Sequence, residues 1–339
     1  MKREDINIRD PFVLTDQGKY YLYGTRSETC WGEAFGFDCY VSKDLENFEG
    51  PIEIFKRPED FFATDSFWAP ECYRIGDAYY LLTTFGDPAI KKGIYALKSD
   101  SPTGPFELYS NRLTPVDWTC IDGTLYFDNE KYYLVFSHSF EDALDGTGNA
   151  DGDYCFVELS ADLKKGLTEP RKLFAPKDTK WAKPVPFAKA EFGIDGDCYF
   201  SDGPFLMKTD SGKLMMFFSS WSVSGYAVGM AYSATGSITG PWVQEDTPLY
   251  PENGGHGMLF KNLDGQLVFT LHSPNDKFME RPQFYYLRNM PHALRRRGGS
   301  TRRFRRRRHR DGVSPQYAKR TFDLLGDRHL PPAGDGRHC

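Results

Sequence analysis

One short pattern occurs five times along this chain of 339 residues, and it constrains the fold more than any other feature. Each copy places a polar residue shortly before a run of strand-forming residues. The runs are GKYYLYGT at 18–25, GDAYYLLTTF at 76–85, EKYYLVFSH at 130–138, GKLMMFFSSW at 212–221 and GQLVFTLHS at 265–273. Repeats of short strands and turns at this period are typical of β-propeller blades. The sequence therefore predicts an all-β fold, a five-bladed β-propeller, over residues 1–289.

The polar residues that open the copies have a common place in the pattern. They are Asp10, Glu71, Asp122, Asp202 and His256, separated by 61, 51, 80 and 54 residues. Because the copies share one skeleton, we expect these residues at the same height on the innermost strand of each blade. Four carboxyl groups and one imidazole would then converge on a single cavity. A single Asp before Pro or Gly is also common in turns, so it is the recurrence that favours a functional site.

The long third interval holds two insertions, 141–153 and 175–196, which we expect to be loops at a propeller face. The first insertion carries four acidic residues that could bind calcium, namely Asp142, Asp145, Asp151 and Asp153. Their spacing does not match an EF-hand. A solvated acidic loop is the interpretation that we favour.

The composition indicates the cellular compartment in which we expect this protein. No apolar run approaches the roughly 20 residues that span a membrane, and the N-terminal MKREDINIRDP lacks the apolar core of a signal peptide. Seven cysteines, an odd number, occur without CxxC spacing, which fits free thiols in a reducing compartment. We therefore expect a cytoplasmic protein with no membrane partner.

Charge divides the chain into an acidic body and a basic tail. Residues 291–339 hold 13 Arg and 1 Lys against 4 Asp, whereas 1–290 carry 28 basic and 43 acidic residues. An acidic body argues against a nucleic-acid partner. The tail, 290–339, is either a disordered basic arm for an anionic partner or a non-native end such as a shifted reading frame, and we favour the second interpretation.

Converging carboxyl groups suit the hydrolysis of a glycosidic bond. One carboxylic acid protonates the leaving oxygen, and a second carboxylate activates water or attacks the anomeric carbon. A third carboxylate close by raises the pKa of the acid and keeps it protonated near neutrality. High aromatic content, 16%, also suits stacking on sugar rings as well as packing between blades.

The motifs as a set resemble glycoside hydrolase family 43, over about residues 5–287. They are Arg-Asp-Pro before KYYLYGT, Trp-Ala-Pro-Glu, Ile-Asp-Gly-Thr-Leu-Tyr-Phe-Asp, Asp-Gly-Pro-Phe-Leu and Gly-Gly-His-Gly-Met. The resemblance implies a five-bladed propeller enzyme that acts mainly on arabinosyl and xylosyl linkages with inversion. It implies no required cofactor and no catalytic metal, and it allows a structural calcium ion near the axis.

The resemblance also implies roles for single residues. Asp10 matches the general base and Asp122 the carboxylate that tunes the acid. The family's acid is a Glu in Glu-Gly-Pro, whereas this chain has Asp202-Gly203-Pro204, one methylene or about 1.5 Å shorter. Asp202 is our candidate acid. The alternatives are that Glu71, Glu191 or a loop carboxylate replaces it, or that the chain is a weak or inactive relative.

The candidate substrate-binding residues are Glu71, Trp68, His256 and Arg281. His256 matches an axial histidine of the family, and Arg281 would reach the sugar from the last blade. Trp68 could equally pack between blades, and His256 could simply bond to backbone.

The sequence thus predicts an inverting glycosidase for arabinofuranosyl or xylosyl units of plant-derived oligosaccharides. Two alternatives are a non-catalytic carbohydrate-binding propeller and a fructosidase-type propeller, for which Glu71-Cys72 would supply the acid. The fructosidase alternative is weakened because its Asn-Asp-Pro-Asn-Gly opening is Arg-Asp-Pro-Phe-Val here. The sequence does not predict which sugar or linkage is cleaved, whether cleavage is terminal or internal, or what the oligomeric state is.

Overall fold

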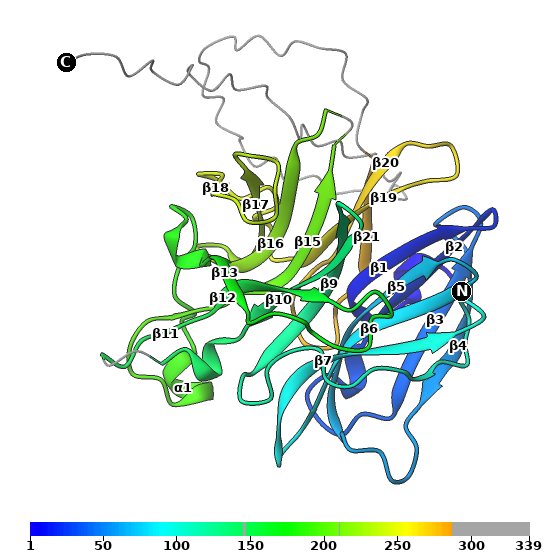
Figure 1. Cartoon of the computed structure of the whole chain (residues 1–339), viewed down its shortest axis with the longest axis horizontal. Helices are drawn as coiled ribbons and strands as arrows, with labels where there is room; N and C mark the ends of the chain where they lie inside the picture. Colours follow the sequence, from blue (N-terminus) through cyan, green and yellow to red (C-terminus); the bar gives the residue numbers. More distant parts are fainter. Residues whose placement is uncertain (145–146, 210, 287–339) are drawn as a thin grey trace, which may run out of the picture.

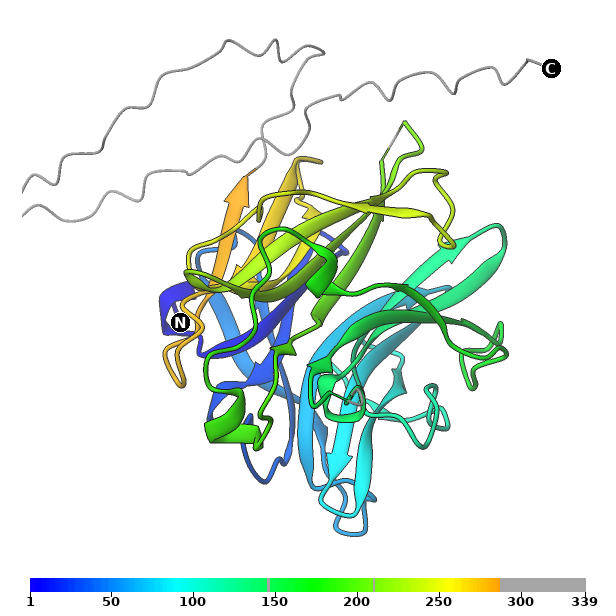
Figure 2. The ribbon, with the colours of Figure 1, turned by 90° about the vertical axis from the view of Figure 1, so that its left-hand side faces the viewer.

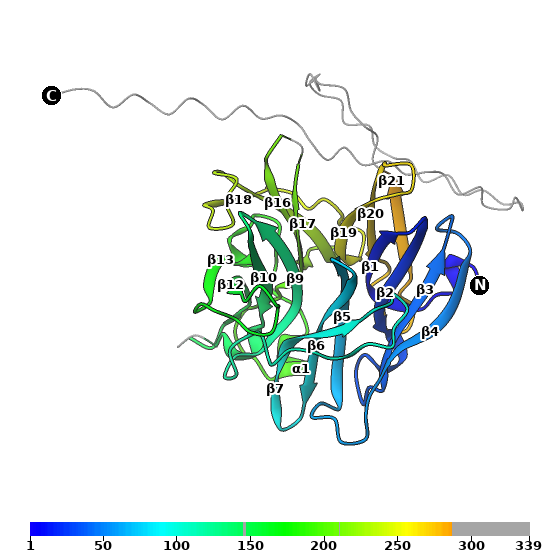
Figure 3. The same cartoon turned by 45° about the vertical axis from the view of Figure 1, so that its right-hand side comes forward.

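The computed structural model describes residues 1–144, 147–209 and 211–286, which form five β-sheets around a central axis (Figure 1). Figure 3 shows β1, β5, β9 and β19 nearest the middle of the molecule. The predicted five-bladed β-propeller is confirmed.

Each blade is an antiparallel sheet whose first strand is innermost. The first blade consists of β1 (Ile8–Asp16), β2 (Lys19–Arg26), β3 (Gly36–Ser42) and β4 (Phe48–Lys56). The second consists of β5 (Asp65–Ile75), β6 (Ala78–Asp87), β7 (Ile90–Ser99) and β8 (Glu107–Leu108). The third consists of β9 (Cys120–Asp128), β10 (Lys131–His138), β12 (Asp153–Leu159) and β13 (Arg171–Phe174). The fourth consists of β15 (Asp202–Lys208), β16 (Leu214–Ser222), β17 (Gly225–Ser233) and β18 (Trp242–Gln244). The fifth, three-stranded within the described residues, consists of β19 (Gly255–Lys261), β20 (Leu267–His272) and β21 (Pro282–Tyr286).

Aromatic side chains pack between neighbouring blades. Phe37 and Phe55 of the first blade meet Phe67 and Phe85 of the second, with ring centroids 5.7–6.1 Å apart. Such apolar contact between the faces of twisted sheets is what holds the blades together, and it accounts for much of the high aromatic content.

A β-bulge interrupts every innermost strand near its beginning. In three blades the bulged residue is polar and has a left-handed backbone, with φ of 53° at Asp10, 56° at Asp122 and 55° at His256. This conformation costs a non-glycine residue about 1–2 kcal/mol. Bulges re-aim side chains, and here they turn these three toward the axis.

The other two blades depart from the expected equivalence. The left-handed position is Ala69 in the second blade, with φ of 46°, and Gly203 in the fourth, with φ of 52°. Glu71 therefore lies two residues beyond the bulge position and Asp202 one residue before it. The five opening residues do not share one height, because a bulge adds a residue to one strand and shifts the facing of those beside it.

Hydrogen bonds across the blades fix these bulges. The backbone N–H groups of Ala69, Asp122 and His256 donate to hydroxyls on the second strand of the preceding blade, at 2.8–3.0 Å. The acceptors are Thr25, Thr84 and Ser219. The same polar position recurs in each blade, so the repeat encodes the contact between blades as well as the strands.

Side chains close the ring between the last and the first blade, which lie next to each other in Figure 2. His272 of β20 accepts the N–H of Asp10 at 3.1 Å through Nδ1. Glu280, which is fully buried, accepts a hydrogen bond from Arg9 at 2.8 Å and another from Ser27 at 2.7 Å. Asn7 donates to the Glu280 carbonyl oxygen at 2.8 Å. These contacts link residues more than 250 positions apart and set the first innermost strand against the last blade.

The two predicted insertions pack against each other on one face. β11 (Ala150–Asp151) pairs in parallel with β14 (Cys198–Tyr199), and the short helix α1 (Ala188–Phe192) lies beside them. The remaining short elements are 3₁₀ turns, η1 (Arg3–Asp5), η2 (Ser27–Thr29), η3 (Phe140–Asp142) and η4 (Pro176–Asp178). The insertions thus form an ordered wall rather than separate loops.

Some of the predictions fall on residues that the structure does not describe, and others are tested only in part. The basic tail, 290–339, and Asp145 lie outside the described residues. Within the described residues, no helix is long and apolar enough to cross a membrane. The six described cysteines are buried free thiols.

Candidate active site

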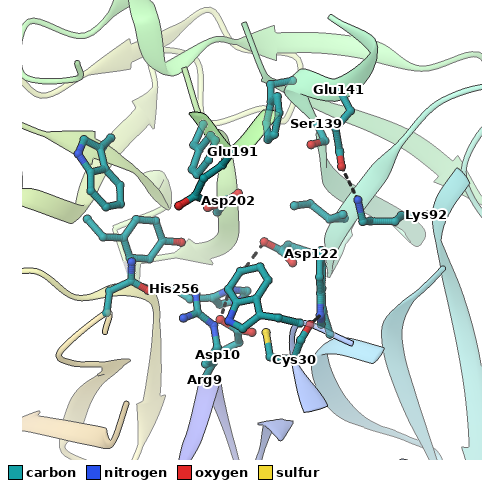
Figure 4. Close-up of a pocket in the computed structure, with 18 of the residues that line it drawn as sticks. Arg9, Asp10, Cys30, Lys92, Asp122, Ser139, Glu141, Glu191, Asp202 and His256 are labelled. Carbon is teal, nitrogen blue, oxygen red and sulfur yellow. Dashed lines mark hydrogen bonds and ion pairs between the residues drawn. The ribbon is translucent and has the colours of Figure 1, made fainter. Parts of the chain in front are cut away.

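A cavity of about 720 Å³ opens where the bulged ends of the innermost strands meet. Every blade contributes to its lining, through Asp10, Trp68, Asp122, Asp202 and His256 in chain order. In Figure 4 the three aspartates and the histidine point into one space. The structure thus brings five of the seven candidate residues to a single site, and it leaves Glu71 and Arg281 outside the lining.

Asp10 is held as a carboxylate. Thr25 donates a hydrogen bond to one oxygen, Oδ2, at 2.6 Å, and His256 Nδ1 lies 3.2 Å from the other. Burial alone would raise the pKa of Asp10, but the cations of His256 and Arg9 outweigh it and hold this pKa well below its usual range. A fixed, ionised carboxylate can accept a proton from water.

Asp202 has the opposite protonation preference. Burial, reinforced by the charge of Asp122, raises the pKa of Asp202 to about 7. The Tyr154 hydroxyl donates to the Asp202 backbone carbonyl at 3.0 Å and so fixes the start of β15. A carboxyl group with this pKa can donate a proton near neutral pH.

Asp122 and His256 lie beside these two groups. Asp122 accepts the N–H of Gly203 at 2.9 Å, and its carboxylate is 3.8 Å from His256 Nδ1. Gly203 must be a glycine here, because a Cβ would lie 2.8 Å from the His256 ring on a left-handed backbone. Burial would lower the pKa of His256, but the charges of Asp10 and Asp122 raise it to about 9. The imidazolium is therefore a fixed cation that neutralises part of the acidic cluster.

Glu71 does not line the cavity. Its carboxyl is buried and accepts a hydrogen bond from Tyr73, which also contacts Thr124 at 3.0 Å. Burial raises the pKa of Glu71 to about 7, against the effect of the Tyr73 hydrogen bond. The bulge at Ala69 accounts for this position. The Glu71 carboxyl contacts Tyr73 and does not line the cavity.

Arg281 also points elsewhere. Its guanidinium donates to the backbone carbonyls of Glu4 and Glu280, at 2.8 and 2.7 Å. The arginine that lines the cavity is Arg9, on β1 next to Asp10. Arg9 is paired with Glu280 and lies over the Trp31 ring at 5.2 Å. Its position directly before Asp10 in the first repeat is the sequence signal that could have identified it.

The walls of the cavity are largely aromatic. Trp31 and Trp68 pack edge to face on one side, with centroids 5.9 Å apart, and Trp31 keeps 56% of its surface exposed. The second insertion and the segments beside the two insertions supply a cluster of rings to the lining, Phe140, Phe187, Phe192 and Phe200, together with Trp221. Wide aromatic faces beside carboxyl groups are suited to sugar rings.

Two carboxylates of the insertions also reach the cavity. Glu191 lines it from α1, and Glu141, which is paired with Lys92, lines it as well. Tyr226 of β17 lines it as well, and no repeat pattern distinguishes this residue in the sequence.

The described residues show no cluster of the side chains that most often bind metal ions. Among them, no group of three or more His, Cys, Asp or Glu side chains is arranged to hold one. The acids of the first insertion pair with lysines instead, as Asp142 with Lys91 at 2.5 Å and Asp153 with Lys172 at 2.9 Å. No catalytic step is therefore assigned to calcium.

Comparison with known proteins identifies the family. The model of the glycosyl hydrolases family 43 matches residues 5–292. The chain belongs to this family. It is therefore a glycoside hydrolase, and an oligosaccharide is its expected class of substrate. A search of curated proteins gave no match.

Solved structures of family 43 enzymes share the fold. An endo-arabinase from Bacteroides thetaiotaomicron VPI-5482 is 35% identical, with a TM-score of 0.75, over 84% of this chain and 95% of the other. An endo-1,4-beta-xylanase from the same organism is 24% identical, with a TM-score of 0.61, over 84% and 91%. An alpha-L-arabinofuranosidase from Lactobacillus brevis is 16% identical, with a TM-score of 0.62, over 84% and 94%. The last two likenesses concern the fold alone.

Proposed function

We propose that this glycoside hydrolase cleaves arabinofuranosyl or xylosyl linkages in oligosaccharides, with inversion at the anomeric carbon. One observation carries the proposal: two carboxyl groups line one cavity, and their surroundings shift their pKa values in opposite directions, well below the usual range for Asp10 and up to about 7 for Asp202. Pairs of carboxyl groups whose pKa values are driven apart mark the base and the acid of such reactions.

The reaction follows from these states. Asp10 removes a proton from a water molecule as the water adds to the anomeric carbon. A proton originating on Asp202 reaches the glycosidic oxygen, the bond from that oxygen to the anomeric carbon breaks, and the leaving sugar departs as an alcohol. Burial and the charge of Asp122 keep the pKa of Asp202 high, while the His256 and Arg9 cations keep Asp10 ionised.

The proposed preference for arabinofuranosyl units is supported by the sequence identity to one solved structure. The endo-arabinase from Bacteroides thetaiotaomicron is 35% identical to this chain over 84% of its length. We therefore place arabinofuranosyl linkages before xylosyl ones. Arg9, Trp31 and Trp68 are the residues that we assign to sugar binding, since all three line the cavity beside Asp10.

The test is a substrate panel. Purified protein is assayed for release of nitrophenol from aryl α-L-arabinofuranoside, β-D-xyloside, β-D-galactoside and β-D-fructofuranoside, and for cleavage of linear arabino-oligosaccharides. We expect arabinoside cleavage, with the first-formed sugar in the inverted configuration by NMR. We also expect Asp202→Asn to lower oligosaccharide cleavage by about 10²–10⁴-fold. Binding of oligosaccharide without any product would instead support a non-catalytic propeller.

The pH profile provides a separate prediction. Asp202 must be protonated to act, so kcat/KM should fall as pH rises through about 7, by tenfold for each further pH unit. Asp10 has a pKa well below its usual range and stays ionised, so we expect no matching decline between pH 5 and 6. Stopped assays on an arabino-oligosaccharide across pH 5–9 would measure this. An alkaline limb that persists in the residual activity of Asp202→Asn would assign it to another group, such as Glu71.

A further inference from the structure

Asn275 lines the cavity, although neither the repeat nor the mechanism above accounts for it. It lies three residues after His272, in the segment between β20 and β21, and its side chain is partly buried. Its backbone N–H donates to the carbonyl oxygen of Asn253 at 2.8 Å, which ties this segment to the one before β19. The Asn275 side chain is thus presented to the cavity from an anchored stretch of backbone.

The carbonyl end of the Asn275 amide meets His272. Asn275 Oδ1 lies 3.1 Å from His272 Nε2. The other ring nitrogen, Nδ1, accepts the N–H of Asp10 at 3.1 Å and therefore carries no proton. A neutral imidazole has one N–H, which must then be on Nε2, and this N–H donates to Asn275 Oδ1. The hydrogen bond from Asp10 thus determines which end of the amide faces the histidine.

His272 is itself held in this neutral form. Its side chain is fully buried, and its ring stacks on Tyr226, with centroids 5.7 Å apart and planes inclined by 22°. Burial, reinforced by the positive charge of Arg9, lowers the pKa of His272 to about 3. The ring is therefore uncharged near neutral pH, and its two nitrogens keep their separate roles as acceptor and donor.

The amino end of the Asn275 amide is left for a ligand. Since Oδ1 is bound to His272, Nδ2 is the other end of the planar group and carries two N–H donors. Among the residues that the structure describes, Nδ2 has no hydrogen-bond partner. Because the side chain lines the cavity, these donors are available to an oxygen atom of a molecule bound there.

The other blades show what the histidine adds. Thr25, Thr84 and Ser219 also accept the backbone N–H of a bulge in the next blade, and each does so through a hydroxyl. His272 fulfils the same role toward Asp10 between the last and the first blade. Its second nitrogen, on the far side of the ring, continues the contact to Asn275. The histidine therefore joins a residue of the cavity wall to the backbone of the catalytic base.

We propose that Asn275 is a substrate-binding residue whose amide N–H groups donate to an oxygen of the sugar unit beside Asp10, and that His272 is the positioning residue that fixes this amide. The amide is two hydrogen bonds away from the Asp10 backbone, which places the contact at the sugar that Asp10 attacks through water. A contact of this kind is made before the reaction begins, so it should lower KM more than it raises kcat.

This inference rests on the proposed function, and two variants of Asn275 test it on an arabino-oligosaccharide. Asn275→Ala removes the amide. Asn275→Asp keeps the shape and an oxygen for His272, and replaces only the NH₂ group with an acceptor. In both variants KM should rise at least about fivefold, with kcat within about threefold of the wild type. Asp276→Ala, in the same segment but outside the lining, removes a 3.1 Å contact with Asn253 and should leave KM unchanged.

Deoxy substrates identify the oxygen that Asn275 contacts. The 2-, 3- and 5-deoxy analogues of 4-nitrophenyl α-L-arabinofuranoside are compared with the parent compound in the wild type and in Asn275→Ala. Intrinsic differences in reactivity cancel, because each analogue is measured against the parent in both proteins. For one analogue the loss of kcat/KM should be at least about fivefold greater in the wild type than in the variant.

The role of His272 is tested by a double-variant cycle. His272→Phe keeps a ring but cannot orient the amide, so KM should rise as in Asn275→Ala. If His272 acts on the sugar through Asn275, adding Asn275→Ala to His272→Phe should raise KM by less than about twofold more. Two independent rises that multiply would remove His272 from this role.

The outcomes separate this inference from the proposed function. An unchanged KM in folded Asn275→Asp, or equal fivefold losses of kcat and none of KM, would overturn the role of Asn275 while wild-type turnover left the proposed function standing. The same holds if every deoxy analogue is discriminated equally by both proteins. A folded wild type without activity on any substrate would overturn the proposed function, and this inference with it.

Discussion

Asp10→Asn should abolish turnover and leave the fold intact, with kcat falling by about 10²–10⁴-fold on arabino-oligosaccharides and aryl arabinosides alike. Asparagine has nearly the same shape, so Thr25 and His256 keep a partner at this position. It cannot take a proton from water. Since activation of water is needed whatever the leaving group, both classes of substrate should be affected, unlike the selective loss expected for the acid.

Asp16→Asn is the matched control, because Asp16 lies at the other end of the same strand, β1, and pairs with Arg74 at 2.9 Å. Its kcat should stay within about twofold of the wild type. Circular dichroism and the thermal midpoint would show whether each variant is folded. Retained activity in a folded Asp10→Asn protein would remove Asp10 from the mechanism.

The five-bladed fold could be predicted because the repeat has a direct physical basis. Each blade needs a turn and a run of apolar and aromatic residues at its second strand, and these recur as KYYLYGT, AYYLLTTF, KYYLVFSH, LMMFFSSW and LVFTLH. The same runs end in the Thr, Ser or His that bonds to the next blade, as Thr84 does to Asp122. One local pattern thus specifies both the pairing of strands within a blade and the contact with the next blade.

At three of the predicted site residues the bulge keeps the repeat in phase. Asp10, Asp122 and His256 share the left-handed position, so their equivalence was visible in the sequence. Glu71 lies off that position, because Ala69 occupies it, and the side chain faces Tyr73 instead of the cavity. A bulge changes the facing of the strand residues beside it, and an alignment of the motifs by sequence alone does not show that change.

Contacts between distant segments explain what the sequence pattern missed. Arg9 enters the site because Glu280, 271 positions away, holds it there, while Arg281 next to Glu280 turns to the backbone. Tyr226 enters because Gly255 on another blade leaves room for its ring. Tyr226 has no local signature in the sequence, and the pairing that holds Arg9 in the site depends on the closed ring.

Glu280→Ala should lower the free energy of unfolding by about 3–5 kcal/mol, the cost of leaving one partner of a buried ion pair without the other. Glu280 is completely buried, and its two oxygens accept from Arg9 at 2.8 Å and Ser27 at 2.7 Å. Its removal leaves a mostly buried guanidinium without this counter-ion at the junction of the first and last blades. Unfolding by urea, followed by tryptophan fluorescence, would measure the change.

Glu46→Ala is the control for this loss, because Glu46 also pairs with an arginine, Arg3 at 3.7 Å, but its side chain is 58% exposed. Exposed pairs contribute at most about 1 kcal/mol, so this variant should unfold close to the wild type. If both variants lost the same small amount, the contacts around Glu280 would not be what closes the ring.

Glu280→Gln keeps an acceptor for Arg9 and tests the site if Glu280→Ala does not fold. The neutral amide holds the guanidinium less firmly, so we expect a smaller loss of stability and a raised KM in the folded protein, with kcat changed less. Arg9 would then be free to move away from Trp31, over which it lies at 5.2 Å. An unchanged KM would separate ring closure from sugar binding and leave Glu280 with a purely structural role.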